Sequence, residues 1–201
     1  MAVLTPRAIS ESAASGGDRI EGSFSFKGPD RNYELNRTPS TDSRGTKGTF
    51  SIWWKPVSIL TTSNEGTILG GYKSSPGDYI YLQYYERSIY WGNQSGQSVW
   101  TEAKNWSPGW QHIVGVWDTT QSTSGDRMKT WLNGVQQTHS STLLNLPSQD
   151  ADFEFFNQDG VKYFVGTRNS KNENGDGNVS QFHFVDGQAL DASYFGYTDS
   201  L

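Results

Sequence analysis

Cysteine is absent from this 201-residue chain. Disulfide bridges, thiolate metal ligands and cysteine nucleophiles are therefore all excluded. Small secreted animal modules more often carry bridges, so their absence favours a microbial, cytosolically assembled or viral protein. A single all-β domain of this length buries enough surface to fold without them.

Clusters of positive charge and long apolar runs are also missing. The net charge is −5, and no group of lysines and arginines is longer than a pair. Nucleic acid and anionic membranes are therefore poor partners. No apolar stretch is long enough to span a membrane, and residues 1–17 have too few apolar side chains after Leu4 for a signal peptide. We expect a soluble chain with no export signal and no membrane insertion.

The sequence also lacks recognisable catalytic motifs. Some glycosidases with a β-sandwich fold carry paired carboxylates at alternate positions of one strand. The nearest match is Asp150-Ala151-Asp152-Phe153-Glu154, whose acidic residues are in the wrong register. We interpret it as a solvent-exposed edge of the domain. His112, His139 and His183 lie in no metal or nucleophile motif, and no Gly-x-Ser-x-Gly elbow occurs, although a triad through a serine and an aspartate stays open. The sequence predicts no catalytic residues and no enzyme activity.

Aromatic residues and glycine are what the chain has in excess, with 8 Trp, 10 Tyr, 10 Phe and 22 Gly. Strands favour aromatic residues, and glycine favours the turns between strands. Segments that alternate with period two recur from Gly22 onward. The predicted strands are 33–37, 50–54, 67–72, 79–85, 88–91, 98–101, 110–117, 127–132, 152–156, 162–165 and 179–185. This many short strands in one domain predict two packed antiparallel sheets or a barrel.

Turn chemistry and alternation give more detailed expectations. Asn133-Gly134 predicts a two-residue hairpin, because a type I′ turn needs positive φ at both central residues. His112 falls on the face of Val114 and is interpreted as a satisfied core histidine. We expect the core between the sheets to include Phe50, Ile52, Val114 and Val116.

The chain divides into an N-terminal arm, residues 1–20, and one domain, residues 21–201. The arm is small and polar and ends in Ser15-Gly16-Gly17-Asp18. We expect it to dock on a neighbouring subunit in an ordered assembly. The alternative is a floppy terminus.

Several motifs point to a known fold. Residues 109–118, Gly-Trp-Gln-His-Ile-Val-Gly-Val-Trp-Asp, and the Asn-Gly hairpin of residues 128–135 resemble a strand pair of laminin-G-like jelly rolls. Residues 50–54 and the segments 165–166 and 176–190 resemble other strands of that family. The resemblance implies an all-β, two-sheet antiparallel β-sandwich, a jelly roll of the concanavalin A-like kind.

A narrower resemblance concerns the two ends of the domain. Residues 33–40, Tyr-Glu-Leu-Asn-Arg-Thr-Pro-Ser, and residues 186–196, Asp-Gly-Gln-Ala-Leu-Asp-Ala-Ser-Tyr-Phe-Gly, resemble the opening and ending of lectin-like domains in virion proteins of marine tailed phages. This implies a structural component on the capsid or tail of a virion, which packs with other virion proteins or with copies of itself. Such a component can also present a face to host cell-surface glycans. A free-standing glycan-binding lectin or adhesion module is the alternative, and a glycoside hydrolase the third hypothesis.

The candidate binding residues are aromatic. They occupy strand positions that alternate with the predicted core positions, or they lie in short polar segments. Such rings stack on sugars or fill pockets on a partner protein, and we favour partner contact because a large exposed ring costs solubility. They are Trp53, Tyr81, Trp91, Trp100 and Trp106.

Calcium is the cofactor that the laminin-G resemblance implies, held by oxygen ligands at the sandwich rim. Asp118, Asp126 and Asp176 are the candidate ligands. The alternative is that these aspartates serve turns, which favour Asp for its backbone preferences.

Overall fold

The computed structural model describes residues 22–26, 35–42, 45–56, 66–73, 78–85, 88–93, 95–102, 109–167 and 175–196. Two predictions lie outside these residues, namely the docking of the arm 1–20 and the candidate Trp106. No helix in the described ranges is long and apolar enough to cross a membrane.

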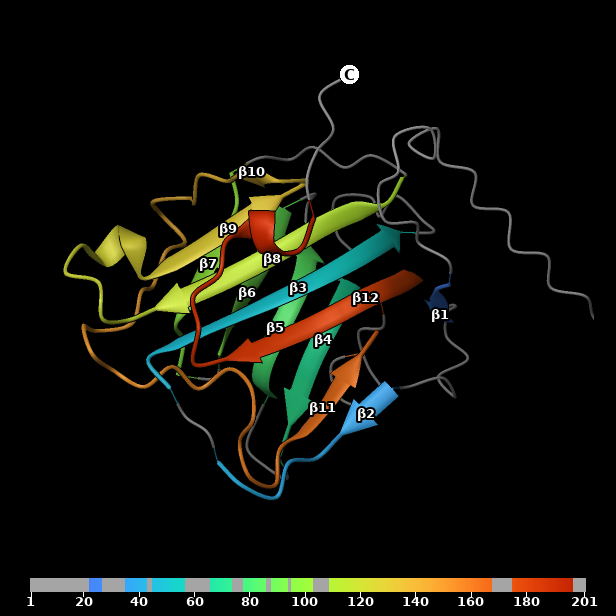
Figure 1. The fold of residues 1–201 in the computed structure, drawn as a ribbon, viewed down its shortest axis with the longest axis horizontal. Coiled ribbons are helices and arrows are strands. Elements are labelled where there is room, and N and C mark those ends of the chain that lie inside the picture. Colours follow the sequence, from blue (N-terminus) through green and yellow to red (C-terminus); the bar gives the residue numbers. More distant parts are fainter. Residues whose placement is uncertain are drawn as a thin grey trace, which may run out of the picture.

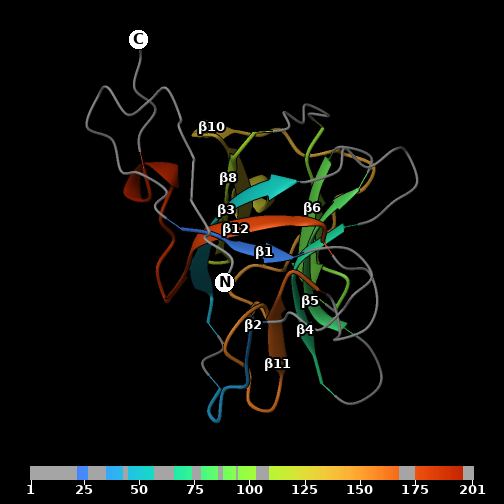
Figure 2. The ribbon, with the colours of Figure 1, turned by 90° about the vertical axis from the view of Figure 1, so that its right-hand side faces the viewer.

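The described strands form two antiparallel sheets that face each other, as Figures 1 and 2 show. Sheet A has the order β1 (Phe24–Phe26), β12 (Gly177–Asp186), β3 (Lys47–Pro56), β8 (Gln111–Asp118), β9 (Met128–Leu132) and β10 (Val135–Gln136). Sheet B has the order β2 (Leu35–Arg37), β11 (Lys162–Val165), β4 (Gly66–Tyr72), β5 (Asp78–Tyr85), β6 (Ser88–Asn93) and β7 (Ser98–Trp100). Two short 3₁₀ turns, η2 (Ser124–Asp126) and η3 (Ala192–Tyr194), complete the described elements. The predicted all-β, two-sheet sandwich is confirmed.

Aromatic rings fill the space between the sheets. Phe50 of β3 meets Trp91 of β6 edge-on, with 5.2 Å between ring centroids, and stacks on Phe155 at 5.4 Å. The backbone makes room for these rings at Gly115, which pairs with Phe50 across the strands. A Cβ atom added to Gly115 would lie 2.2 Å from the Phe50 ring, so only glycine fits there.

A hydrogen-bonded chain of polar groups crosses this core. The Trp91 indole Nε1 on sheet B donates to the Thr130 hydroxyl on sheet A at 2.8 Å. The same hydroxyl lies 3.0 Å from Nε2 of His139. Trp91 and Thr130 are both fully buried. The chain therefore satisfies polar atoms that would otherwise cost free energy in an apolar interior.

The core predicted between the sheets is right for β3 and wrong for β8. Phe50 and Ile52 belong to the core between the sheets, as predicted. Val114 and Val116 are buried, but they face the opposite side of sheet A, where they pack with Ala192 and the half-buried Trp131 and Phe195. The expectation that both valines lie between the sheets is wrong, because a segment distant in sequence covers the outer face of β8.

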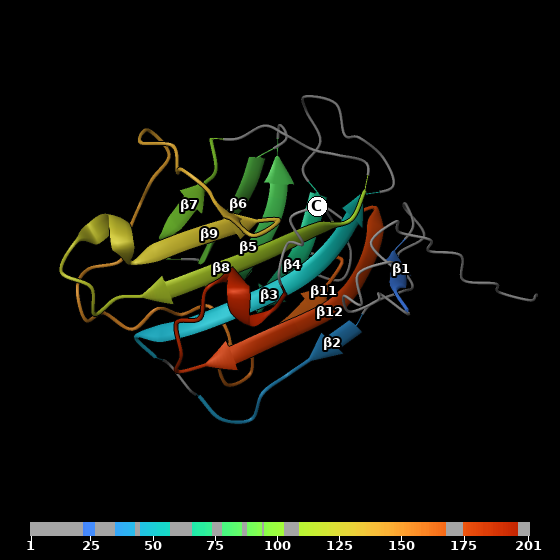
Figure 3. The same ribbon diagram turned by 45° about the horizontal axis from the view of Figure 1, so that its top comes forward.

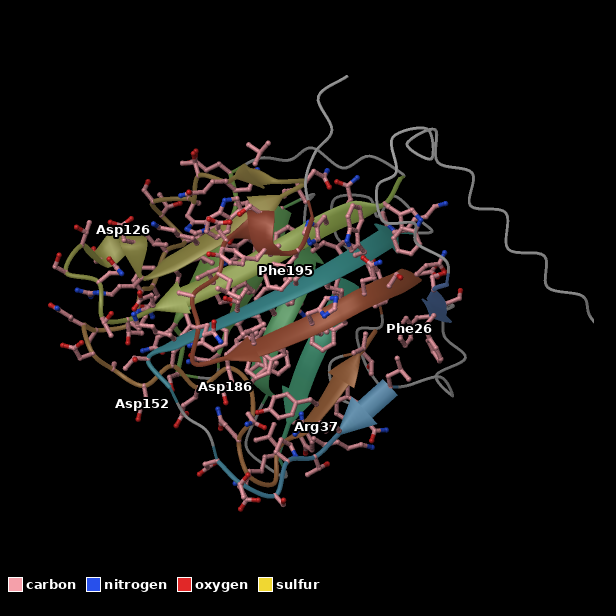
Figure 4. The ribbon with its side chains drawn as sticks, viewed as in Figure 1. Phe26, Arg37, Asp126, Asp152, Asp186 and Phe195 are labelled. Carbon is pink, nitrogen blue, oxygen red and sulfur yellow. The ribbon has the colours of Figure 1, made fainter. Side chains whose placement is uncertain are left out.

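That covering segment is residues 187–196, here called the C-terminal latch (Figure 3). The Thr49 hydroxyl on β3 donates to the Gln188 carbonyl at 2.8 Å and accepts from the Leu190 amide at 2.8 Å. Asp191 caps η3 by accepting from the Ser193 amide at 2.9 Å. Phe195 lies over the outer face of sheet A in Figure 4. The latch thus covers Val114 and Val116 on the outer face of sheet A.

Of two local predictions, one is confirmed and one is wrong. The Asn133-Gly134 hairpin is confirmed, with φ of 51° and 78° at its two residues. Residues 152–156 are not a strand, and only an isolated bridge joins Phe153 to Gly45. Phe153 and Phe155 nevertheless point into the core. Their alternating burial produced the pattern of a strand without strand pairing.

Candidate functional site

The outer face of sheet B carries a cluster of aromatic rings. On β5, Ile80, Leu82 and Tyr84 are buried against the core, so the alternating positions Tyr81 and Tyr85 face outward. Both outward rings are half-buried.

The next two strands repeat this pattern. Ile89 and Trp91 of β6 face the core, which places Tyr90 on the outer face. Val99 of β7 faces the core, which places Trp100 on the outer face. We call Tyr81, Tyr85, Tyr90 and Trp100 the aromatic patch.

The rings of the aromatic patch contact one another across three strands. Tyr90 stacks on Trp100 with 4.1 Å between centroids and 29° between planes. Tyr81 lies 4.6 Å from Tyr90, and Tyr85 meets Trp100 edge-on at 5.6 Å. The patch therefore spans two inter-strand spacings, about 10 Å. Packing against one another and against the sheet holds the rings in place before any ligand arrives.

Polar groups accompany the rings. The Tyr90 hydroxyl donates to the Tyr81 hydroxyl at 2.6 Å. Gln83, on the same face of β5, donates from Nε2 to the Thr67 hydroxyl at 3.0 Å. The patch combines apolar ring surface with the hydroxyl groups of its tyrosines, whereas Gln83 is only 3% exposed and bonds to Thr67 beneath the rings. This combination suits a ligand that has both C–H faces and hydroxyl groups.

Two of the five predicted aromatic residues, Tyr81 and Trp100, come together in the patch. Sequence analysis missed Tyr85 and Tyr90. The alternation along the strands could have identified them. Tyr85 is on the same face of its strand as Tyr81, and Tyr90 is on the face opposite to the apolar Ile89.

Trp91 and Trp53 lie elsewhere. Trp91 is fully buried in the core and cannot contact a partner, so its assignment as a binding residue is wrong. Trp53 is half-buried on the outer face of sheet A, where it stacks on His112 at 4.7 Å and 12°. It belongs to a different face from the aromatic patch.

His112 is satisfied, as predicted, but under the outer face of sheet A. Its Nε2 lies 2.8 Å from the Ser51 hydroxyl. Burial, with a smaller contribution from the nearby His183, lowers the pKa of His112 to about 4. Although serine and histidine are hydrogen-bonded as in a nucleophile pair, Ser51 is only 1% exposed, so its hydroxyl is closed to a substrate.

The candidate calcium ligands do not converge. Asp118 forms an ion pair with Lys47 at 3.3 Å, at the start of β3, whereas Asp176 precedes Gly177, which pairs with Pro56 at the end of β3. Ten residues of strand separate these positions by about 30 Å. Asp126 pairs instead with Lys129 at 3.0 Å. Asp126 is the last residue of η2, which Figure 4 shows at the end of sheet A opposite to Phe26.

Neighbouring side chains stabilise the charged Asp118 carboxylate without a metal ion. Burial acts to raise its pKa, but hydrogen bonds from Thr120, Gln121 and Lys47 outweigh burial and lower the pKa below the ordinary value. Thr120 donates to Oδ1 at 2.6 Å and Gln121 to Oδ2 at 2.8 Å. Within the described ranges, no three His, Cys, Asp or Glu residues are grouped to hold a metal ion. The three aspartates do not fit one shared calcium site.

Comparison with known proteins shows similarity in fold. No protein-family model and no curated protein matches the sequence. Among solved structures, domains LG4-5 of the mouse laminin alpha1 chain match with a TM-score of 0.56 and 15% identity, over 88% of this chain and 45% of that chain.

Two further solved structures support the same conclusion. A heptameric SAP-like pentraxin from Limulus polyphemus matches with a TM-score of 0.54 and 17% identity, over 80% of this chain and 73% of that chain. Domain 4 of an extracellular arabinanase from Geobacillus stearothermophilus, solved in complex with arabinotriose, matches with a TM-score of 0.51 and 15% identity, over 87% and 82%. At these identities the likeness shows the fold, a laminin-G-like jelly-roll sandwich.

Proposed function

We propose that this laminin-G-like sandwich is a non-enzymatic glycan-binding module, and that its binding face is the aromatic patch. The observation that carries the proposal is the arrangement of four half-buried rings, supplied by three adjacent strands, on the outside of sheet B. Sheets that face water normally place polar side chains outward. A cluster of outward rings is explained when a ligand covers it.

A glycan fits the patch better than the protein partner that the sequence favoured. The hydroxyl pair of Tyr81 and Tyr90 lies among the rings, so apolar and polar contacts alternate within about 10 Å. A sugar presents both C–H faces and hydroxyl groups. The arabinanase domain, solved in complex with arabinotriose, is a precedent for glycan binding in this fold.

The test is binding to a glycan array by wild-type protein and two variants. Trp100→Ala removes the ring that contacts both Tyr85 and Tyr90. We expect it to weaken binding to the best glycan about tenfold or more, equivalent to about 1.4 kcal/mol. Trp53→Ala, which removes a half-buried tryptophan from the other sheet, is the control and should bind as wild type. Equal losses in both variants would contradict the proposed face.

The absence of catalysis is part of the proposal. Asp152 and Glu154 flank the buried Phe153 in a segment that is not a strand, so they do not form the carboxylate pair of a glycosidase strand. We expect no reducing sugar to be released from common β-glucans. Release that is lost in Glu154→Gln would refute this part.

The setting that we propose is a phage virion, on the strength of the sequence resemblance. The resembling segment 186–196 is an ordered part of the fold, because it supplies the C-terminal latch with its cap at Asp191. We propose that copies of the chain assemble and that the arm 1–20 takes part. Deleting residues 2–17 should leave melting nearly unchanged and reduce the oligomeric mass measured by light scattering. A monomeric full-length chain would favour the free-standing lectin.

A further inference from the structure

The tip of the β9–β10 hairpin places a reactive pair of residues at the surface. Asn133 is followed by Gly134, and asparagine is one of the thermolabile residues of proteins. Glycine has no Cβ atom, so its backbone nitrogen meets little steric hindrance when it approaches a neighbouring carbonyl carbon. Asn133 is also exposed to water. By sequence and exposure alone, this asparagine should lose its side-chain amide.

The contacts of the Asn133 side chain oppose that reaction. Its Oδ1 accepts from the His112 backbone amide at 2.8 Å, and its Nδ2 donates to Oε1 of Gln111 at 2.8 Å. Both partners lie on β8. Gln111 is only 3% exposed, so close packing holds the acceptor in place. Both polar atoms of the Asn133 side chain are therefore bound to β8.

The backbone at Asn133 is held as well. Its amide donates to the His112 carbonyl at 2.8 Å, which extends the pairing of β8 with β9 to the hairpin tip. The φ angles of 51° at Asn133 and 78° at Gly134 are those of a two-residue loop, which the pairing of Val135 with Leu132 closes. Because both the side chain and the loop are held, the Gly134 nitrogen reaches Cγ of Asn133 only when the hairpin tip opens.

We infer that Asn133 is a site of spontaneous deamidation, and that its contacts with β8 protect it in the folded protein. In the reaction, the Gly134 nitrogen forms a bond to Cγ of Asn133 and the Cγ–Nδ2 bond breaks. Nδ2 leaves as ammonia with the proton of the Gly134 amide, so its hydrogen bond to Gln111 has to break. Water then opens the resulting five-membered imide. Opening at Cγ gives aspartate, and opening at the backbone carbonyl gives isoaspartate.

Neither product fits the hairpin tip as asparagine does. The aspartate has no N–H group to donate to Oε1 of Gln111. The isoaspartate runs the main chain through Cγ and so lengthens a loop whose geometry depends on two residues of positive φ. Deamidation should therefore lower the melting temperature of the protein.

The experiment compares the folded chain with the chain denatured in guanidinium chloride, in one alkaline buffer and with sodium chloride matching the ionic strength. Peptide mass spectrometry measures aspartate and isoaspartate at position 133. We expect the reaction at Asn133 to be about tenfold or more slower in the folded protein, equivalent to about 1.4 kcal/mol. The chain has a second Asn-Gly pair, Asn174-Gly175, which serves as the standard for the denatured chain only. Both pairs should react at similar rates there.

Two variants separate the local contacts from overall stability. Gln111→Met removes the acceptor of the Asn133 Nδ2 bond and should speed the reaction in the folded protein about threefold or more. Its rate in the denatured chain should not change. Val161→Ala is the control, because it removes methyl groups from the core cluster and lowers stability without touching the hairpin contacts. It should leave the folded rate as in the wild type.

Three results would overturn the inference. Equal rates in the folded and denatured wild type would show that the contacts do not protect Asn133, and this comparison needs no variant. An Asn133 that stays intact in the denatured chain while Asn174 reacts would show that it is not a deamidation site. Equal acceleration by Gln111→Met and Val161→Ala would assign the protection to overall stability instead of to the bond with Gln111.

Discussion

At the scale of single residues, the Thr130 hydroxyl links the two sheets by a hydrogen bond. Thr130 accepts from the Trp91 indole at 2.8 Å and is also hydrogen-bonded to His139. We predict that Thr130→Val, which keeps the shape of the side chain, lowers the free energy of unfolding by about 1–3 kcal/mol, because it leaves the Trp91 Nε1 proton unpaired. Urea denaturation measures the change.

Thr130→Ser is the matched control. It keeps the hydroxyl and removes one methyl group, which should cost about 1 kcal/mol. If Thr130→Val proved as stable as the wild type while Thr130→Ser did not, the hydrogen-bonded chain would have no part in stability.

Two histidines with lowered pKa values, the buried His112 and the half-buried His139, predict how stability depends on pH. Burial lowers the pKa of His139, and burial with a smaller effect of His183 lowers that of His112, in each case from 6.5 to about 4. Between these values the unfolded chain binds more protons than the folded chain, so the free energy of unfolding falls as the pH falls from about 6.5 towards about 4. Each histidine should contribute on the order of 1 kcal/mol between pH 6.5 and 5.

Denaturation at pH 7, 6 and 5 tests this prediction. His112→Gln and His139→Gln should each reduce the slope of stability against pH, and the double variant should lose most of it. A double variant with the wild-type slope would show that other groups cause the pH dependence.

Sequence alone predicted residues whose surroundings are local. Asn133-Gly134 specified its own turn. His112 was also expected to be satisfied, and it is, although its partner Ser51 is distant in sequence and was not predicted. Trp91 was misplaced because the residues around it are polar or small, and only the strict alternation Ile89-Tyr90-Trp91 shows which ring turns inward. The patch residue Tyr90 was missed for the same reason.

At the scale of elements, the C-terminal latch converts the outer face of β8 into a second, smaller core. Val114 and Val116 are 0% and 6% exposed beneath it. Every residue of β8 is buried. Alternation along this strand therefore could not show which face lies between the sheets, and the sequence could not show that residues near position 190 would cover residues near position 115.

The latch leads to a stability prediction. Phe195 is half-buried against Val114 and Val116, so Phe195→Ala should lower the free energy of unfolding by about 1–3 kcal/mol. Tyr194 is the adjacent control, because it is 69% exposed and Tyr194→Ala should change stability by less than about 0.5 kcal/mol. Thermal melting of the three proteins gives the comparison. Equal melting temperatures would mean that the latch is not packed in solution.

At the scale of the whole molecule, the two outer faces of the sandwich differ. On sheet A the latch covers Val114 and Val116, and the half-buried Trp53 is stacked on His112. Sheet B presents the aromatic patch. The resemblance in sequence identified the sandwich, but the difference between its faces depends on contacts between strands distant in sequence.

Calcium tests another property of the whole molecule. Because Asp118, Asp126 and Asp176 do not share a site, we expect the melting temperature to be the same in calcium and in chelator to within about 2 °C. A larger stabilisation by calcium, kept in Asp118→Asn, would reveal a site built from other residues.

The most direct test of the account is to map a bound glycan on the protein by amide and indole chemical shifts in NMR titration. The probe is the oligosaccharide that the array ranks first. We predict that shifts concentrate on the backbone of β5, β6 and β7 and on the indole N–H of Trp100. Shifts that concentrate instead around Trp53 on sheet A, or around Asp118 at the rim, would contradict the assignment of the aromatic patch as the binding face.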